Sequence, residues 1–152
     1  MAARIVEVCD AVVAVIAAAW SPTGNDTVSR EYDADIDSKK LVGRKVYVFP
    51  ASYANPEPSS RSEDFYDYAV AVMVSERYED AGRVPNSWVD DRIAFTRDKV
   101  YEPLSDARTL LILGTLYPLT AEVDPVYDVD ELRSRKLFVS VVNFTFRESV
   151  EV

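Results

Sequence analysis

KLFVSVVNFTFR, residues Lys136 to Arg147, is the stretch of sequence that decides the fold. Its side chains alternate as they do in a β-strand, where successive residues point to opposite faces of a sheet. The apolar face is expected to comprise Phe138, Ser140, Val142, Phe144 and Phe146. The opposite face, which becomes polar toward its end, is expected to comprise Leu137, Val139, Val141, Asn143, Thr145 and Arg147. The pattern predicts a long strand with one covered face.

The segment Ala3 to Trp20 predicts an amphipathic helix. Its apolar stripe comprises Ile5, Val8, Val12, Val13, Ile16, Ala17 and Trp20. Its polar-to-small face is expected to comprise Arg4, Glu7, Ala11, Ala14 and Ala18. Cys9 lies beside the stripe and is interpreted as a small buried side chain rather than a reactive thiol. Acids at positions 7 and 10 argue against a signal peptide, and the apolar run is too short to cross a bilayer.

Three further strands and a loop are predicted between the first helix and the middle of the chain. Shorter strands are expected over Val28 to Ile36 and Lys45 to Phe49, before a Pro- and Ser-rich loop from Ala51 to Ser62. The longest of the three is expected over Glu63 to Tyr78. Its core face would carry Tyr66, Tyr68, Val70, Val72 and Val74.

A second helix is predicted after Pro85, with Ser87 as its N-cap, Asp90 three residues on, and its exit at Pro103. The side chains expected to face the sheet are Val89, Ile93, Val100 and Leu104. We therefore expect a single domain, residues 1–152, with an α+β fold. Its mostly antiparallel sheet of four to five strands would carry two main helices on one face.

Two segments connect this helix to the long strand near the end of the chain. A strand is expected over Leu110 to Thr120, with a bend at a glycine or proline. An acidic connection then runs from Glu122 to Arg135 and is expected to hold a helical turn over Asp128 to Arg133. These acids are interpreted as solvated, with weak Mg²⁺ binding as the alternative.

The composition restricts the classes of function. The chain has 26 acidic and 17 basic residues and a net charge of −9, so it is not expected to grip a nucleic-acid backbone. It has no histidine, the commonest general base and metal ligand at neutral pH. One cysteine allows no disulfide within the chain, and a reducing, cytoplasmic setting is the simpler interpretation. No cofactor is expected, because the four scattered glycines form no phosphate-binding loop.

One motif resembles the start of a calcium loop. Asp33, Asp35 and Asp37 have the D-x-D-x-D spacing. Ser38 stands where that loop needs glycine, and Arg44 where it needs glutamate, so no metal site is predicted. The acids are interpreted as a solvated strand edge, which discourages sheet-to-sheet pairing.

Loop positions and charge give candidate contacts with other subunits or partners. An exposed tyrosine in a Pro/Ser loop can anchor a partner protein, and arginines near the long strand can pair with acids of a neighbouring subunit. The candidate interface residues are Tyr53, Asn55, Arg61, Arg77, Arg83, Asp33 and Asp35. No catalytic residue is predicted.

Taken together, these elements resemble the tail-terminator, or tail-completion, proteins of long-tailed bacteriophages. The resemblance covers nearly the whole chain as a pattern of elements, and other small neck and minor capsid proteins share it. It rests on the helix from Ala3 to Trp20, the segments Ser29 to Tyr32 and Leu41 to Pro50, the strand from Tyr66 to Ser75, the helix after Pro85, and Phe138 to Arg147.

The resemblance implies a structural role in the virion, for a protein made in the host cytoplasm. Such proteins cap the tail tube, end its polymerisation and join it to the head-side connector protein. They act as hexameric rings without catalytic residues, and DNA passes through the channel without specific binding. Six copies of this chain would carry a charge of −54, which would repel DNA from the channel wall. No membrane partner is implied.

Three alternatives stay open from the sequence. The chain could be another neck or minor capsid protein. It could be a small acidic Mg²⁺-dependent hydrolase, which needs convergent acids from 33–37 or 122–131. It could also be an acidic module that mimics DNA, although long apolar strands argue against so polar a surface.

Overall fold

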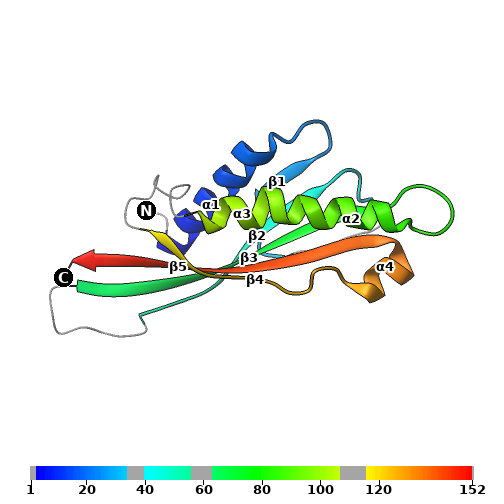
Figure 1. The fold of residues 1–152 in the computed structure, drawn as a ribbon. Helices are drawn as coiled ribbons and strands as arrows, with labels where there is room; N and C mark the ends of the chain where they lie inside the picture. The colour runs from blue at the N-terminus through cyan, green and yellow to red at the C-terminus, as the bar shows by residue number, and fades with distance from the viewer. Residues whose placement is uncertain (1–2, 34–39, 56–62, 107–115, 152) are drawn as a thin grey trace.

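The computed structural model describes residues 3–33, 40–55, 63–106 and 116–151. The helices and strands follow in the order α1 (Arg4–Trp20), β1 (Thr27–Arg30), β2 (Lys45–Ala54), β3 (Glu63–Arg77), α2 (Asn86–Phe95), the π-helical segment η1 (Thr96–Tyr101), α3 (Glu102–Ser105), β4 (Tyr117–Val123), α4 (Val129–Arg135) and β5 (Leu137–Glu151). In Figure 1, α1 and the continuous helical run α2–η1–α3 lie on the same side of the strands.

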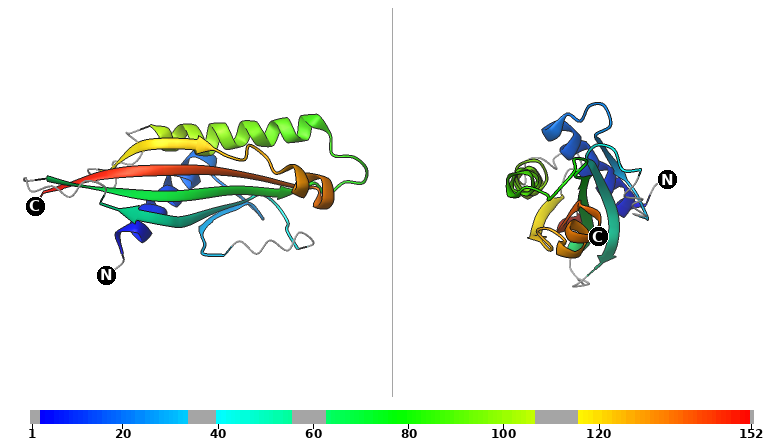
Figure 2. Two further views of the ribbon diagram at one scale, coloured as in Figure 1. Left: turned by 90° about the horizontal axis from the view of Figure 1, so that it is seen from below. Right: turned by 90° about the vertical axis from the view of Figure 1, so that its right-hand side faces the viewer.

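The strands form one mixed sheet in the order β1-β2-β3-β5-β4. Only β1 and β2 run parallel, and the other neighbouring pairs are antiparallel. Strands β3 and β5 pair from Glu63↔Glu151 to Arg77↔Leu137, which makes them the long central ribbon. The predicted α+β class is therefore confirmed. From below, the central strands lie in front of α1 and no described helix covers them (Figure 2, left).

The core lies between the sheet and the helices. The predicted apolar face of β5, from Phe138 to Phe146, is fully buried there, and so are Val70, Val72 and Val74 of β3. From α1 the core receives Val8, Val12 and Ile16, and from the second helical run it receives Val100 and Leu104. Alternation in the strands and three- and four-residue spacing in the helices therefore identified the core correctly.

Cys9 is fully buried in this core, as predicted. Burial raises the pKa of its thiol to about 11, so the sulfur is protonated at neutral pH and unreactive. The expectation for Ala11 was wrong. It is buried rather than part of the outer face, because β1 and β2 both contact α1 and widen the covered surface of the helix.

Several predicted boundaries were wrong around prolines. Strand β2 continues past Pro50 to Ala54, so residues 51–54 belong to a strand and not to a loop. The pairing with β3 shifts between Pro50 and Ser52, and such an irregularity accommodates a residue that has no N–H to donate. Similarly, the helical run passes Pro103, which lies in the first turn of α3, and ends at Ser105.

Other boundaries also differ from the prediction. The strand expected from Val28 ends at Arg30, and β4 begins at Tyr117 and continues to Val123. The rest of these two predictions falls on residues 34–39 and 107–115, which lie outside the described residues. Ser87 is not an N-cap, because α2 begins at Asn86 with Pro85 in the cap position and no side-chain cap bond. The turn expected over Asp128 to Arg133 is α4.

Candidate assembly surface

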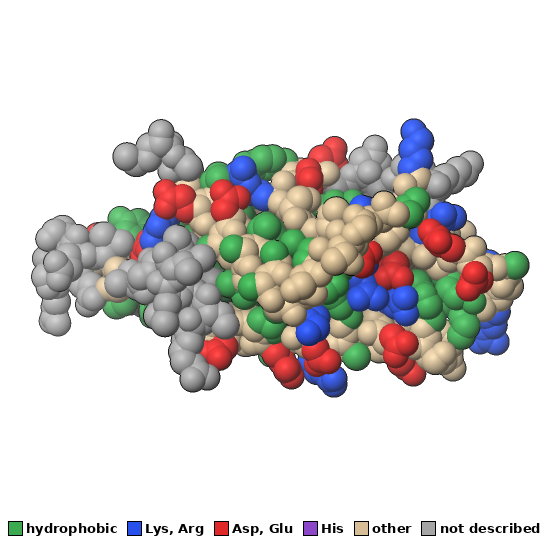
Figure 3. All heavy atoms as spheres, turned by 90° about the horizontal axis from the view of Figure 1, so that it is seen from above, with side chains coloured by type: hydrophobic (Ala, Val, Ile, Leu, Met, Phe, Trp, Pro, Cys, Tyr) green, Lys and Arg blue, Asp and Glu red, His purple; other side chains and the backbone are tan. Residues whose placement is uncertain are grey.

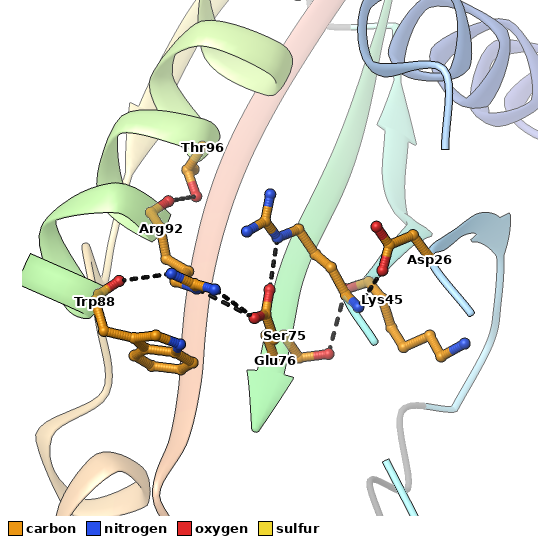
Figure 4. A network of polar contacts seen from close by, with 8 residues as sticks. Asp26, Lys45, Ser75, Glu76, Trp88, Arg92 and Thr96 are labelled. Atoms are coloured by element: carbon orange, nitrogen blue, oxygen red, sulfur yellow. Dashed lines mark hydrogen bonds and ion pairs between the residues drawn. The ribbon is translucent and has the colours of Figure 1, made fainter. Parts of the chain in front are cut away.

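A clamp of charged side chains joins β3, α2 and the residue just before β2 on the helix side of the sheet (Figure 4). Its centre is Glu76 of β3. The carboxylate accepts a hydrogen bond of 2.7 Å from Nε of Arg44 and another of 2.7 Å from Nη2 of Arg92 in α2. The side chain of Glu76 is only 15% exposed, and both arginines are similarly covered.

The two arginines of this clamp also lie over aromatic rings. The guanidinium of Arg92 is 4.3 Å from the ring centroid of Trp88, and that of Arg44 is 4.1 Å from the ring centroid of Phe95. Such cation–π contacts add stability where water is excluded. Because the Glu76 carboxylate binds two guanidinium groups, we interpret the clamp as a structural contact that holds α2 against the sheet.

A second polar group lies near the other end of β3 and β5. Glu148 is 5% exposed, and it accepts two hydrogen bonds from the guanidinium of Arg4 at the start of α1. The Tyr68 hydroxyl donates to Oε1 of Glu148 over 3.4 Å. The bond to Glu148 raises the pKa of Arg4, and burial, followed by the charge of Glu148, raises the pKa of Tyr68 to about 12.

The raised pKa of Tyr68 predicts a loss of stability at alkaline pH. The folded state favours the neutral phenol, so this contribution is present below about pH 10 and is lost toward about pH 12. We expect the free energy of unfolding to fall more steeply across this interval in the wild type than in Tyr68→Phe. Urea unfolding followed by circular dichroism at several pH values measures both slopes, and parallel slopes would contradict the prediction.

The described acids do not converge on a metal site. Asp128 accepts the backbone N–H of Glu131 and caps α4, and Glu131 pairs with Arg135 at 2.6 Å. Within the described residues, no group of three or more Asp, Glu or Cys side chains is placed to hold a metal ion. Two acids of the connection from Glu122 to Arg135 therefore stabilise α4, a role that the sequence pattern did not predict.

The second face of the sheet lies away from α1 and the α2–η1–α3 run. We call it the open face. It presents the half-buried side chains Tyr47, Phe49, Ala71, Met73 and Val141. They share this face because they alternate with residues of β2, β3 and β5 that point into the core, and the register pairs Tyr47 with Met73 and Met73 with Val141.

Both ends of the open face are closed by specific contacts. At one end, Leu41 packs with Leu137, Val139 and Met73 in a small apolar cluster. At the other end, Arg147 makes a two-bond contact with Asp67, at 2.7 and 3.0 Å. The middle of the face carries the apolar surface around the Tyr47 and Phe49 rings, whose centroids are 6.3 Å apart.

The helix side has a different character. Figure 3 shows it with acidic and basic side chains interspersed rather than in a single-sign field. On the described residues of this side, that distribution is typical of a solvated surface, and they form no continuous basic track for a nucleic-acid backbone. The open face is therefore the better candidate for assembly.

The candidate interface residues from the sequence do not form one site. Tyr53 is exposed on β2, and Asn55 just after it has a buried Oδ1 without a hydrogen-bond partner in the described structure. Arg77 ends β3 at the opposite end of the sheet, where its Nη2 lies 3.7 Å from Glu79. Arg83 lies in the loop before α2.

The other candidate residues are less informative. Asp33 is exposed just after β1, whereas Arg61 and Asp35 lie outside the described residues. Sequence reasoning missed Glu76 and its two arginines, and it missed the aromatic residues of the open face. A period-two reading of Lys45 to Phe49 would have placed Tyr47 and Phe49 on the face opposite Val46 and Val48.

The comparisons with known proteins assign no family to this surface. No protein-family model matches the chain, and no curated protein matches it. Within the part of the chain that the structure describes, no helix has both the length and the apolar content to cross a membrane.

Proposed function

We propose that this protein is a virion structural subunit of the tail-terminator or neck type in a long-tailed bacteriophage. It assembles into a ring of six copies, caps the tail tube and joins it to the head-side connector. The observation that supports the proposal most strongly is the one-sided fold, in which a long sheet carries helices on one face and half-buried aromatic side chains on the other. Such a face is typical of a surface that is completed by another protein.

The resemblance of the sequence to tail-terminator proteins supports the same proposal. The polar groups of the described core also agree with a structural role, because Glu76 and Glu148 are held by arginines and serve packing. The net charge of −9 on each copy gives the ring a strongly negative field, so DNA slides through the channel without specific binding. No feature of the described acids favours the Mg²⁺-dependent hydrolase over this function.

An experiment on the open face tests the proposal. Phe49→Glu places a charge at the centre of the apolar surface, and burying it between subunits costs several kcal/mol. We expect the variant to fold, by circular dichroism, but to lose binding to the ends of purified tail tubes in electron micrographs. Thr23→Glu adds the same charge on an exposed loop and is expected to bind like the wild type. Tube binding that is equal in both variants would contradict a role for the open face.

A further inference from the structure

A pocket with basic walls lies near the end of the molecule where α4 meets β5. Its volume is about 440 Å³, and it is formed by the loop before α2, the start of α2, and α4 with the residue that follows it. The side chains that give it chemical character are Arg83, Arg133, Lys136, Val89, Leu132 and Tyr127. It thus combines three cations with an apolar and aromatic lining, and a hollow of this size holds a side chain with its flanking residues.

The cations of this pocket are left uncompensated by the acids near them. In the described structure, neither Arg83 nor Arg133 has a carboxylate within 4.0 Å, and Lys136 contacts only the backbone oxygen of Asp80, at 3.4 Å. Asp128 and Glu131 are used by α4 itself, as its cap and as the partner of Arg135. In a chain with nine more acids than bases, this concentration of unpaired positive charge favours an acidic ligand.

The opposite edge of the sheet carries a segment that complements the pocket. Strand β1 is one edge of the sheet and β4 the other, and Glu31–Tyr32–Asp33 follows β1 directly. Tyr32 is 71% exposed, and Asp33 is exposed beside it without a hydrogen-bond partner among the described residues. Within the subunit, Arg30 donates to the Tyr32 hydroxyl over 3.0 Å and is itself paired with Asp10, and Ser29 donates to the Glu31 carboxylate over 3.0 Å. The exposed ring of Tyr32 and the carboxylates of Glu31 and Asp33 match a pocket with apolar walls and three cations.

The separation of the two surfaces decides how they can meet. The pocket is formed by the loop after β3, the start of α2 and the segment around α4, so it lies at the end of the sheet where β3 ends and β5 begins. Glu31–Asp33 follows the edge strand β1, which β2 separates from β3. Two surfaces that lie apart on one subunit contact each other only between copies. Such a head-to-tail contact generates a closed ring when the rotation between copies closes.

We infer that the basic pocket of one subunit binds the Glu31–Asp33 segment of the next, with Tyr32 in the pocket and the two carboxylates at its cations. This inference rests on the proposed ring and names the side-to-side contact within it. The open face then stays available for the tail tube or the connector. Charge complementarity at this contact also gives the ring its direction, because basic pockets repel one another.

A charge swap tests this contact. We expect Arg133→Glu and Asp33→Arg each to weaken self-association by about ten- to a hundredfold in dissociation constant, the lower part of the range for close charge pairs across interfaces. The double variant Arg133→Glu/Asp33→Arg is expected to recover most of that loss. Lys99→Glu makes the same charge reversal at a half-buried lysine of η1 outside the pocket and is the control. Sedimentation velocity over a concentration series, with and without tail tubes from the same virion, measures the association.

The outcomes separate this inference from the proposed function. If Arg133→Glu assembles like the wild type, or if the double variant recovers no association, the pocket is not the contact between subunits. Rings that still form on tube ends would leave the proposed function intact in that case. If the wild type forms no assembly, either by itself or on tube ends, both the pocket contact and the proposed function are wrong. The pocket contact is supported if the two single variants lose association and the double variant recovers it.

Discussion

Replacing Phe144 by alanine is expected to lower the free energy of unfolding by about 3 to 5 kcal/mol, the usual cost of emptying a buried aromatic site. Phe144 is fully buried on β5, and its ring stacks on that of Phe146 with centroids 5.6 Å apart. It pairs with Val70 of β3 and Ala121 of β4, so the cavity would open at the centre of the sheet. Urea unfolding, followed by circular dichroism and tryptophan fluorescence, measures the loss.

Leu119→Ala is the matched control for this substitution. Leu119 lies on the edge strand β4 and is 40% exposed, so its truncation is expected to change the free energy of unfolding by less than about 0.5 kcal/mol. A loss below about 1 kcal/mol for Phe144→Ala would show that the face from Phe138 to Phe146 is not the main core.

Removing the carboxylate of the clamp is expected to have the second-largest effect. Glu76→Ala leaves Arg44 and Arg92 as two poorly solvated cations without their shared partner. Breaking a buried ion pair from one side costs up to 5 kcal/mol, and the partial exposure of this group lowers the expected loss to about 2 to 3 kcal/mol. Thermal and urea unfolding measure this loss.

Two other variants locate the origin of this loss. Glu76→Gln keeps hydrogen-bond acceptors without the charge and is expected to fall between the wild type and Glu76→Ala. Glu79→Ala removes a carboxylate that is 54% exposed and 3.7 Å from Arg77, so a loss below about 0.5 kcal/mol is expected. Equal losses for Glu76→Ala and Glu79→Ala would contradict a specific role for the clamp.

Most of the fold could be predicted from local periodicity. Alternate residues of β5 and β3 form the core face, and β5 carries Phe138, Phe144 and Phe146 where alternation places them. Two of the boundary errors lie at Pro50 and Pro103, where a local rule for ending an element was overridden by the pairing of β2 with β3 and by the continuing helix. Tertiary contacts decide such boundaries, and a single sequence does not display them.

The candidate site could be predicted only in fragments. Arg83 and Asp33 were selected from the sequence by charge and position, whereas Arg133 and Lys136 join Arg83 only because α4 folds beside the start of α2. Glu76 was hidden because its partners, Arg44 and Arg92, lie 32 residues before it and 16 residues after it. Contacts between distant segments produce both groups, so spacing along the chain carried no sign of them.

The molar mass of the assembled protein tests the proposed ring most directly. Light scattering after size exclusion, across a concentration series and again on tail-tube ends released from virions, measures it. We expect a species of six copies of the 17.1 kDa chain, about 103 kDa, either at high concentration or on the tube ends. A strictly monomeric protein of 17.1 kDa that is also absent from tube ends would contradict the proposed function.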